Sequence, residues 1–207
     1  MSEVKQDSAQ TCALLDAIGR GEARALEDLL QRHRPQLHDF VTIHCDPRLR
    51  GRIDPSDVVQ DTQMEVVRRI DDFLASRPMP FRLWLRKKAM ERLSNLRRDH
   101  LTRARRSVAR EQAWPDRSSL LLARPLLAAG PSPSQHAQAQ ELAERVSRAV
   151  AQLAEADREI LLLRHAEDLP FEEIACLLEI EPAAARKRFG RALIRLQTVL
   201  RAEGLVE

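Results

Sequence analysis

Apolar residues recur every three or four positions along most of the chain, which is the period of an α-helix. A first pair of helices is predicted on either side of the break at Gly19-Arg20-Gly21, with apolar positions at Leu14, Leu15, Ile18, Leu26, Leu29 and Leu30. The sequence Asp54-Pro55-Ser56 is a helix start signal, and helical spacing follows it at Val59, Val66, Ile70 and Phe73. No strand-like alternation of useful length occurs, so the pattern predicts an all-α fold.

The rest of the chain follows the same pattern, with one interruption. One apolar stripe consists of Phe81, Leu85, Ala89, Leu93 and Leu96, and a later helix is marked by Leu142, Val146, Val150 and Leu153. We expect Asp157 to be the N-cap of a helix that carries Ile160–Leu163. Residues 111–140 hold four prolines and the sequence Gly-Pro-Ser-Pro-Ser, which resist helix formation. The predicted organisation is two small helical domains, with an N-terminal tail at 1–11, a first domain at 12–110, a linker at 111–137 and a second domain at 138–207.

The composition agrees with a helical protein and excludes several classes. Only 3% of the 207 residues are aromatic and none is Tyr, so the core must consist of Leu, Val, Ile and Ala. The longest aliphatic run, Ile160–Leu163, is far shorter than the roughly 20 residues of a membrane span. No secretory leader is visible, and three scattered cysteines fit a reducing compartment. We therefore expect a cytoplasmic protein without membrane insertion.

The net charge of +3 hides three blocks of alternating sign. Residues 82–110 contain eleven cations and two acids, residues 141–181 contain four arginines and eleven acids, and residues 182–201 contain six cations and no acid. This pattern predicts two cationic surfaces separated by an acidic one, and cationic surfaces favour a nucleic-acid partner.

Residues 171–185 have the spacing of a helix-turn-helix. Ile174 and Leu178 would point inward, the small Ala175 lets the second helix approach, and Pro182 fits the first position of that helix. Glu179 stands where glycine is usual, so the turn needs either a left-handed residue or a different shape. The second helix would enter the major groove of DNA or, alternatively, form a solvated face of a bundle. Its cations are Arg186, Lys187, Arg188, Arg191 and Arg195.

The basic helix at 81–106 is the second candidate surface for nucleic acid. Its apolar stripe leaves Arg82, Arg86, Lys87, Arg97 and Arg98 facing outward, and Arg103, Arg105 and Arg106 continue the charge. Because only Glu91 and Asp99 are nearby in sequence, we expect these cations to neutralise phosphates rather than to pair within the chain. Trp84 lies beside the stripe, where it would either stack on an unpaired base or fill space between helices.

A carboxylate stripe forms the third feature, because Asp57, Asp61 and Glu65 are spaced by four. Hard cations need ligands that converge from several directions, so a metal site is not predicted here. The stripe is either a solvated face or a docking face for a basic partner.

Motifs on both sides of the proline-bearing linker resemble the bacterial sigma factors of RNA polymerase. The N-terminal motifs, which are similar to the second conserved region of these proteins, are Arg48 to Asp61 and Phe81 to Lys87. The C-terminal motifs, which are similar to the fourth conserved region, are Leu153 to His165, the helix-turn-helix and Arg191 to Leu196. The resemblance is closest to the extracytoplasmic-function group, in the form found in planctomycete-like bacteria. Glu91 departs from the pattern, since many relatives have Asn at this position.

The resemblance implies a protein that binds core RNA polymerase and directs it to promoter DNA, with an anti-sigma factor as a further partner. Polymerase docking is then assigned to Asp57, Gln60, Asp61 and Glu65. Opening and reading of the −10 element is assigned to Arg82, Trp84, Arg86, Lys87, Arg97, Arg98, Arg103, Arg105 and Arg106. Reading of the −35 element is assigned to Ala183, Ala184, Arg186, Lys187, Arg188 and Arg191. The linker would run toward the polymerase active-site cleft.

Two other functions compete with this interpretation. A stand-alone helix-turn-helix regulator would bind DNA without polymerase, but it would not need residues 54–106. An enzyme with a metal cluster could use His33, His38, His44 and Cys45, but their spacings match no common zinc pattern. The sequence has no phosphate-binding glycine loop and no nucleophile elbow, so we expect no catalytic residue, metal or cofactor.

Overall fold

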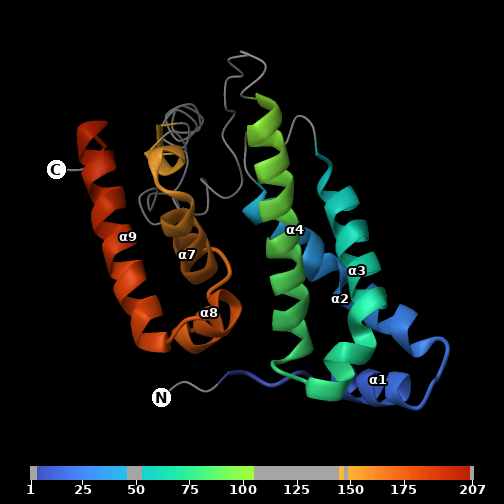
Figure 1. Cartoon of the computed structure of the whole chain (residues 1–207). Coiled ribbons are helices and arrows are strands. Elements are labelled where there is room, and N and C mark those ends of the chain that lie inside the picture. Colours follow the sequence, from blue (N-terminus) through green and yellow to red (C-terminus); the bar gives the residue numbers. More distant parts are fainter. Residues whose placement is uncertain (1–3, 46–52, 105–144, 147–148, 206–207) are drawn as a thin grey trace, which may run out of the picture. The chain divides into compact units, whose positions relative to one another are not determined.

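A computed structural model describes residues 4–45, 53–104, 145–146 and 149–205 of the chain. The chain divides into two compact units, Met1–Ala109 and Arg110–Glu207. Figure 1 shows that the described parts of both units are built from helices, and no strand occurs among them. The predicted all-α fold is therefore confirmed. None of the helices in the described ranges is long and apolar enough to cross a membrane.

In its described residues the first unit contains four helices, α1 (Ala9–Gly19), α2 (Ala25–His44), α3 (Pro55–Ser76) and α4 (Phe81–Ala104). The predicted break between the first two is confirmed, and Gly21 there has a φ of 80°. The start of α3 also agrees with the sequence signal. The Asp54 carboxylate accepts a hydrogen bond from the Ser56 N–H at 2.8 Å, and Pro55 occupies the first turn, where no amide donor is required.

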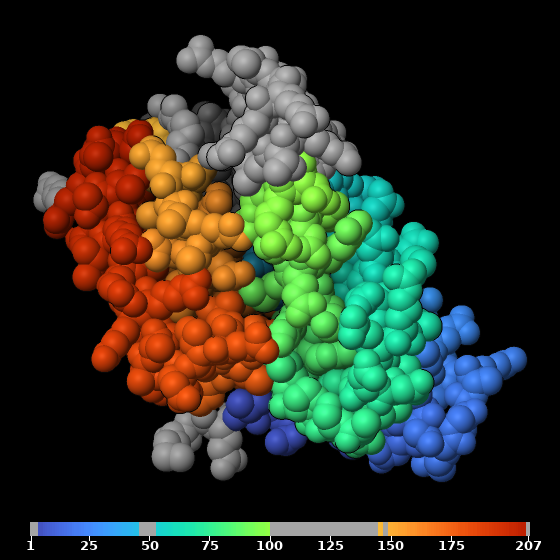
Figure 2. Space-filling view, in the orientation of Figure 1, coloured from blue at the N-terminus to red at the C-terminus, as the bar shows by residue number. Residues whose placement is uncertain are grey.

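The core of the first unit lies where α2, α3 and α4 pack together. Phe40, Leu29 and Val59 are fully buried there, as are Phe81 and Leu83 of α4. The predicted stripe on α4 is buried from Phe81 to Leu93, and Leu96 is half-buried. In Figure 2, the side chains of α3 and α4 form adjoining strips on the surface of this unit.

The segment before α1 caps two helices with two consecutive residues, and we call residues 5–8 the N-terminal clip. The Ser8 hydroxyl accepts a hydrogen bond from the Thr11 N–H at the start of α1. The Asp7 carboxylate accepts hydrogen bonds from the N–H groups of Phe81 at 2.6 Å and Arg82 at 3.3 Å, at the start of α4. Because these N–H groups have no partner within their own helix, the clip supplies a cap that the sequence before α4 lacks.

The second unit contains a helical stretch at 145–146 and 149–152, then α7 (Glu155–His165), α8 (Phe171–Leu178) and α9 (Pro182–Ala202). Its core includes Ile160, Leu161, Leu163 and Ile174, which are fully buried. The prediction that Asp157 is an N-cap is wrong, because α7 begins at Glu155 and Ala154 is its N-cap. Asp157 instead lies within the first turn, where it is 3% exposed and accepts a hydrogen bond from Arg195.

Candidate nucleic-acid and protein interfaces

The turn between α8 and α9 has the shape of a helix-turn-helix. Glu179 ends α8 in the left-handed conformation, with φ 54° and ψ 43°. Of the two predicted alternatives, a left-handed residue or a turn of different shape, the left-handed residue is therefore confirmed. Ile180 then donates its N–H to the Ala175 carbonyl at 3.0 Å, and Pro182 starts α9. Ala175 is 4% exposed, so its small side chain lies in the contact between the helices.

The N-terminal half of α9 presents an open face of small and cationic side chains. Ala185 and Ala192 are fully buried and fix the inner side of the helix. The exposed face includes Ala183, Ala184, Arg186, Lys187 and Arg191, all of them residues predicted to read DNA. Within the part of the chain that the structure describes, Lys187 and Arg191 have no ion-pair partner. These two cations therefore lie at a surface that a phosphate backbone could approach.

Three further cations of α9 make ion pairs inside the second unit. Arg186 donates to Glu172 of α8 at 2.6 Å. Arg188 donates its Nε–H to the Ala156 carbonyl and lies 3.6 Å from Glu159. Arg195 donates to the buried Asp157 at 2.6 Å. The acidic block thus neutralises part of the final basic block and ties α9 to α7 and α8.

The cations of α4 are less free than the sequence predicts. Lys88 pairs with Glu91 at 2.8 Å, and Arg92 donates two hydrogen bonds to Asp61 of α3. Arg82 donates to the Lys5 carbonyl at 2.6 Å. The expectation that the cations of this block do not pair within the chain is therefore wrong for Lys88, which pairs with Glu91 of the same helix, and for Arg92, because packing brings Asp61 of α3 beside α4.

Several residues assigned to the −10 element have a definite environment. Trp84 is 7% exposed, and its ring packs against Phe73 at 4.6 Å and Phe81 at 5.9 Å between centroids. It therefore fills space between helices, one of the two alternatives that the sequence leaves open. The Arg86 guanidinium lies over the Phe40 ring at 5.5 Å. Lys87 and Arg97 are half-buried and Arg98 is exposed. The side chain of Arg103, with Arg105 and Arg106, lies outside the described residues.

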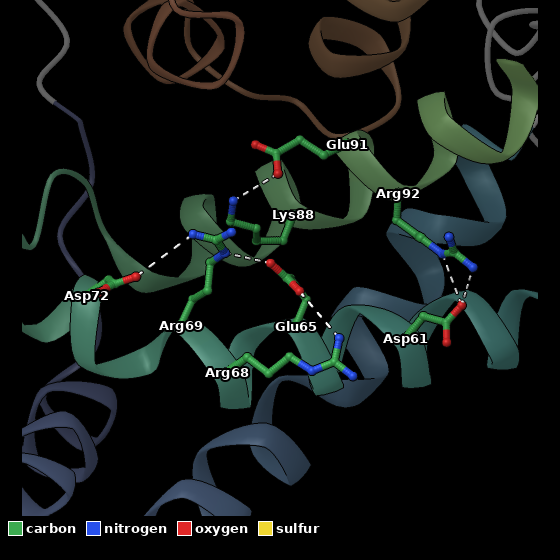
Figure 3. A network of polar contacts seen from close by, with 8 residues as sticks. All are labelled: Asp61, Glu65, Arg68, Arg69, Asp72, Lys88, Glu91 and Arg92. Carbon is green, nitrogen blue, oxygen red and sulfur yellow. Dashed lines mark hydrogen bonds and ion pairs between the residues drawn. The ribbon is translucent and has the colours of Figure 1, made fainter.

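The carboxylate stripe of α3 is divided between an open end and a paired end. Asp57 and Gln60 are exposed near the start of the helix. Asp61 and Glu65 belong to the polar network in Figure 3, where Glu65 accepts a hydrogen bond from Arg69 at 2.6 Å. This hydrogen bond lowers the pKa of Glu65 and raises the pKa of Arg69. The four residues assigned to docking thus share one helix face, but only its first turns are free of the network.

Two apolar residues on α3 were not assigned to a site by the sequence. Met64 is 48% exposed and Val67 is 49% exposed. Val67 borders a groove of about 290 Å³ between α2 and α3, whose other lining residues are Ala23, Leu26, Glu27, Leu30, Gln31 and Gln63. The signal was present in the sequence, because Met64 and Val67 fall outside the stripe that Val59, Val66 and Ile70 form. Two apolar side chains left outside the core in this way are candidates for a protein contact.

The histidines considered for a metal cluster have separate environments in the described residues. His33 lies 3.2 Å from the Thr11 hydroxyl, and His44 stacks on Phe40 with centroids 4.2 Å apart. Burial is the main cause that lowers the pKa of both, and that of His44 falls to about 3. His38 is exposed. No group of three His, Cys, Asp or Glu residues within the described ranges could hold a metal ion.

Comparisons with known proteins agree with this geometry. Residues 143–196 match the family described as "Sigma-70, region 4", and this span includes α7, α8 and the first part of α9. The chain is 29% identical over 183 residues to the RNA polymerase sigma factor CnrH of Cupriavidus metallidurans, an alignment that covers 88% of this chain and 90% of CnrH.

Solved structures show the same fold. The structure of CnrH in complex with the cytosolic domain of CnrY aligns with a TM-score of 0.59 at 24% identity and covers 94% of this chain and 99% of CnrH. The sigma factor RpoE of Bartonella quintana, in complex with the anti-sigma factor NepR, aligns with a TM-score of 0.57 at 20% identity and covers 86% and 98%. The chain is therefore similar over most of its length to one RNA polymerase sigma factor, has the helical fold of two sigma factors of known structure, and matches the sigma-70 region 4 family at residues 143–196.

Proposed function

We propose that this protein is a sigma factor of the extracytoplasmic-function group, which binds core RNA polymerase in the cytoplasm and directs it to promoters. The second unit reads the −35 element, and the first unit opens and reads the −10 element. The observation that carries the proposal is the helix-turn-helix of the region 4 match, whose second helix leaves Ala183, Lys187 and Arg191 open to DNA. The restriction to the planctomycete-like form stays a prediction.

The −35 element is read by the N-terminal half of α9 in this proposal. A recognition helix contacts base edges with residues near its N-terminus, and small side chains there let the helix lie deep in the groove. Ala183 and Ala184 meet that requirement, and Lys187 and Arg191 are the free cations beside them. Arg186 and Arg188, the neighbouring cations of the helix, are both paired with acids of the second unit.

The −10 element is opened by α4 and the residues after it. Separated strands need a cationic surface, and Arg86, Lys87, Arg97 and Arg98 supply one along the helix. Trp84 could stack on a base only after it left its packing against Phe73 and Phe81. Arginine side chains, rather than aromatic rings, are therefore the main contacts of this unit with single-stranded DNA.

Core polymerase docks on α3. Asp57, Gln60, Asp61 and Glu65 offer a polar and largely acidic strip, and we add the exposed Met64 and Val67 as its apolar centre. An interface with a desolvated apolar centre and a polar rim is the usual arrangement for protein contacts. The two related proteins of known structure were solved with CnrY and with the anti-sigma factor NepR. We propose that an anti-sigma factor also binds this chain.

Paired substitutions test the division of labour between the units. Replacing Arg186 and Lys187 with Ala should weaken binding of the polymerase complex to duplex DNA through the −35 element. Replacing Arg97 and Arg98 should leave duplex binding intact and impair strand opening, measured by permanganate reactivity of unpaired thymines. The assignment is wrong if both pairs give the same defect or if neither gives one.

A stand-alone regulator is the competing function, and polymerase binding separates the two. Purified protein should bind core polymerase with a measurable affinity, and combined replacement of Met64 and Val67 with Lys should reduce that affinity by at least tenfold. Replacement of Asp71, which is exposed two turns away from Met64 on the same helix, provides the control. A wild-type protein that binds promoter DNA but not core polymerase would be a regulator and not a sigma factor.

A further inference from the structure

The ion pair between Glu172 and Arg186 joins the two helices of the helix-turn-helix on the side where DNA is expected. The Glu172 carboxylate accepts a hydrogen bond from Arg186 Nη2 at 2.6 Å, and Glu172 is the second residue of α8 while Arg186 is the fifth residue of α9. The Glu172 side chain is 20% exposed and the Arg186 side chain is 52% exposed. The carboxylate is thus mostly enclosed, while the guanidinium remains open on one side.

An aromatic ring holds the same guanidinium from a second direction. The Arg186 Cζ atom lies 5.6 Å from the centroid of the Phe171 ring, and Phe171 is packed edge-on against Phe189 at 5.5 Å. A guanidinium is planar, and an ion pair together with an aromatic contact restricts both its position and its plane. Lys187 and Arg191, one and five residues further along α9, have no such partners within the described residues.

A restrained arginine and a free one suit different contacts with DNA. Contacts to phosphates tolerate a range of side-chain positions and carry no sequence information. A bidentate contact from Arg to the O6 and N7 atoms of guanine depends on the plane and position of the guanidinium. Arg186 has five N–H donors, and the pair with Glu172 engages one nitrogen, so the others remain available for a base edge.

We propose that Glu172 is a positioning residue that fixes Arg186 for sequence-specific reading of a guanine in the −35 element, whereas Lys187 and Arg191 bind phosphates. This inference rests on the proposed function, because it assumes that α9 reads promoter DNA. Glu172 does not contact the DNA in this proposal and acts only through Arg186. It contributes base preference at one position rather than affinity for DNA in general.

The alternative role for Glu172 is simple charge repulsion. In that case its carboxylate would oppose all phosphates near α9, and removing the charge would strengthen binding to every duplex. Two variants separate the roles. Glu172→Gln removes the charge and keeps the length of the side chain. Glu172→Asp keeps the charge but shortens the side chain by one methylene, which withdraws the carboxylate from Arg186.

The experiment measures base preference for the full chain bound to core polymerase. A pool of duplexes randomised over the upstream promoter region is equilibrated with each complex, and the bound fraction is sequenced. The matched control is Glu181→Gln, which removes the same charge from an exposed residue at the start of α9. A further variant, Arg186→Lys, keeps the positive charge but lacks the planar guanidinium that a bidentate contact with guanine needs.

The wild-type complex is expected to enrich guanine at one position of the selected duplexes. Glu172→Gln, Glu172→Asp and Arg186→Lys should each reduce that enrichment by about tenfold at that position alone, which is within the range of one bidentate contact. Glu181→Gln should keep it. The dependence of affinity on salt should be unchanged in Glu172→Gln, because no phosphate contact is gained.

Three results would overturn the inference alone, and a fourth would overturn it together with the proposed function. Glu172→Gln could bind every duplex more tightly, with a salt slope steeper by about 0.9, which would indicate a new phosphate contact and a purely repulsive role. Glu172→Asp could keep the wild-type preference, which would show that the negative charge alone, without the contact to Arg186, is sufficient for the base preference. Both Glu172 variants could keep the full guanine preference that the wild-type complex shows, which would overturn the inference and leave the proposed function standing. A wild-type complex with no base preference would overturn the proposed function and the inference together.

Discussion

The contact between Asp7 and the start of α4 makes a quantitative prediction for the stability of the first unit. Pro80 precedes α4 and has no side-chain acceptor, so the only side-chain cap that the described residues give this helix comes from Asp7, 74 residues before Phe81. Loss of a capping side chain costs about 1 kcal/mol, and loss of a negative charge at a helix N-terminus costs about 0.5 kcal/mol more. Asp7→Ala should therefore lower the free energy of unfolding by about 1.5 kcal/mol.

Urea unfolding of the first unit measures this change. Trp84 is buried in that unit, and replacing the other tryptophan, Trp114, with Phe in all variants makes Trp84 fluorescence the sole reporter. For a slope near 1.5 kcal/mol per molar urea, the midpoint should fall by about 1 M. Asp7→Asn keeps one acceptor but loses the charge, so its midpoint should fall by about a third as much.

Asp71→Ala is the matched control, because it removes an exposed carboxylate from α3 of the same unit and should change stability by less than about 0.5 kcal/mol. If Asp7→Ala matched this control, the hydrogen bonds from Phe81 and Arg82 would contribute nothing to folding. The description of the N-terminal clip as a cap would then be wrong.

Further predictions concern the second unit and the effect of pH. Arg195→Ala should leave the 3% exposed Asp157 carboxylate without its hydrogen bond and lower the free energy of unfolding of the second unit by about 2 kcal/mol. Amide hydrogen exchange in α7 should be faster in this variant and unchanged in the control Arg191→Ala. Equal exchange rates in the two variants would show that the pair of Arg195 and Asp157 is not structural. The pKa of His44 is lowered to about 3, so the unfolded chain binds a proton there below about pH 6.5 and the folded chain does not. The first unit should therefore be fully stabilised by neutral His44 above pH 6.5 and lose stability as the pH falls toward 5. His44→Gln should reduce that pH dependence, and an unchanged dependence would contradict the assigned burial of the imidazole.

Local sequence rules predicted the ends of several helices because those ends depend on neighbouring residues alone. Asp54 and Pro55 start α3 as their sequence requires, and the break at Gly21 separates α1 from α2. The local rule for the turn also holds at Glu179, although this residue adopts the left-handed conformation less readily than glycine. The geometry of a helix-turn-helix demands a left-handed backbone at that point, and the chain adopts it without glycine.

Long-range contacts account for what the sequence did not predict. Asp157 has the character of an N-cap, but Arg195 of α9 pairs with it inside the first turn. The basic block on α4 has few acids near it in sequence, yet Arg92 finds Asp61 on the neighbouring helix. The clip residue Asp7 belongs to a segment predicted to be a tail. In each case the partner of the charged side chain depends on how the segments of the chain pack together. The spacing of apolar residues along one helix does not predict which segments become neighbours.

Transcription by the reconstituted complex tests the central claim most directly. Core RNA polymerase is combined with this protein on genomic DNA, and the 5′ ends of the transcripts are sequenced. The account predicts discrete start sites that are absent with core polymerase alone and share two sequence elements upstream, at the spacing of −35 and −10. Start sites that are the same with and without the protein would contradict it.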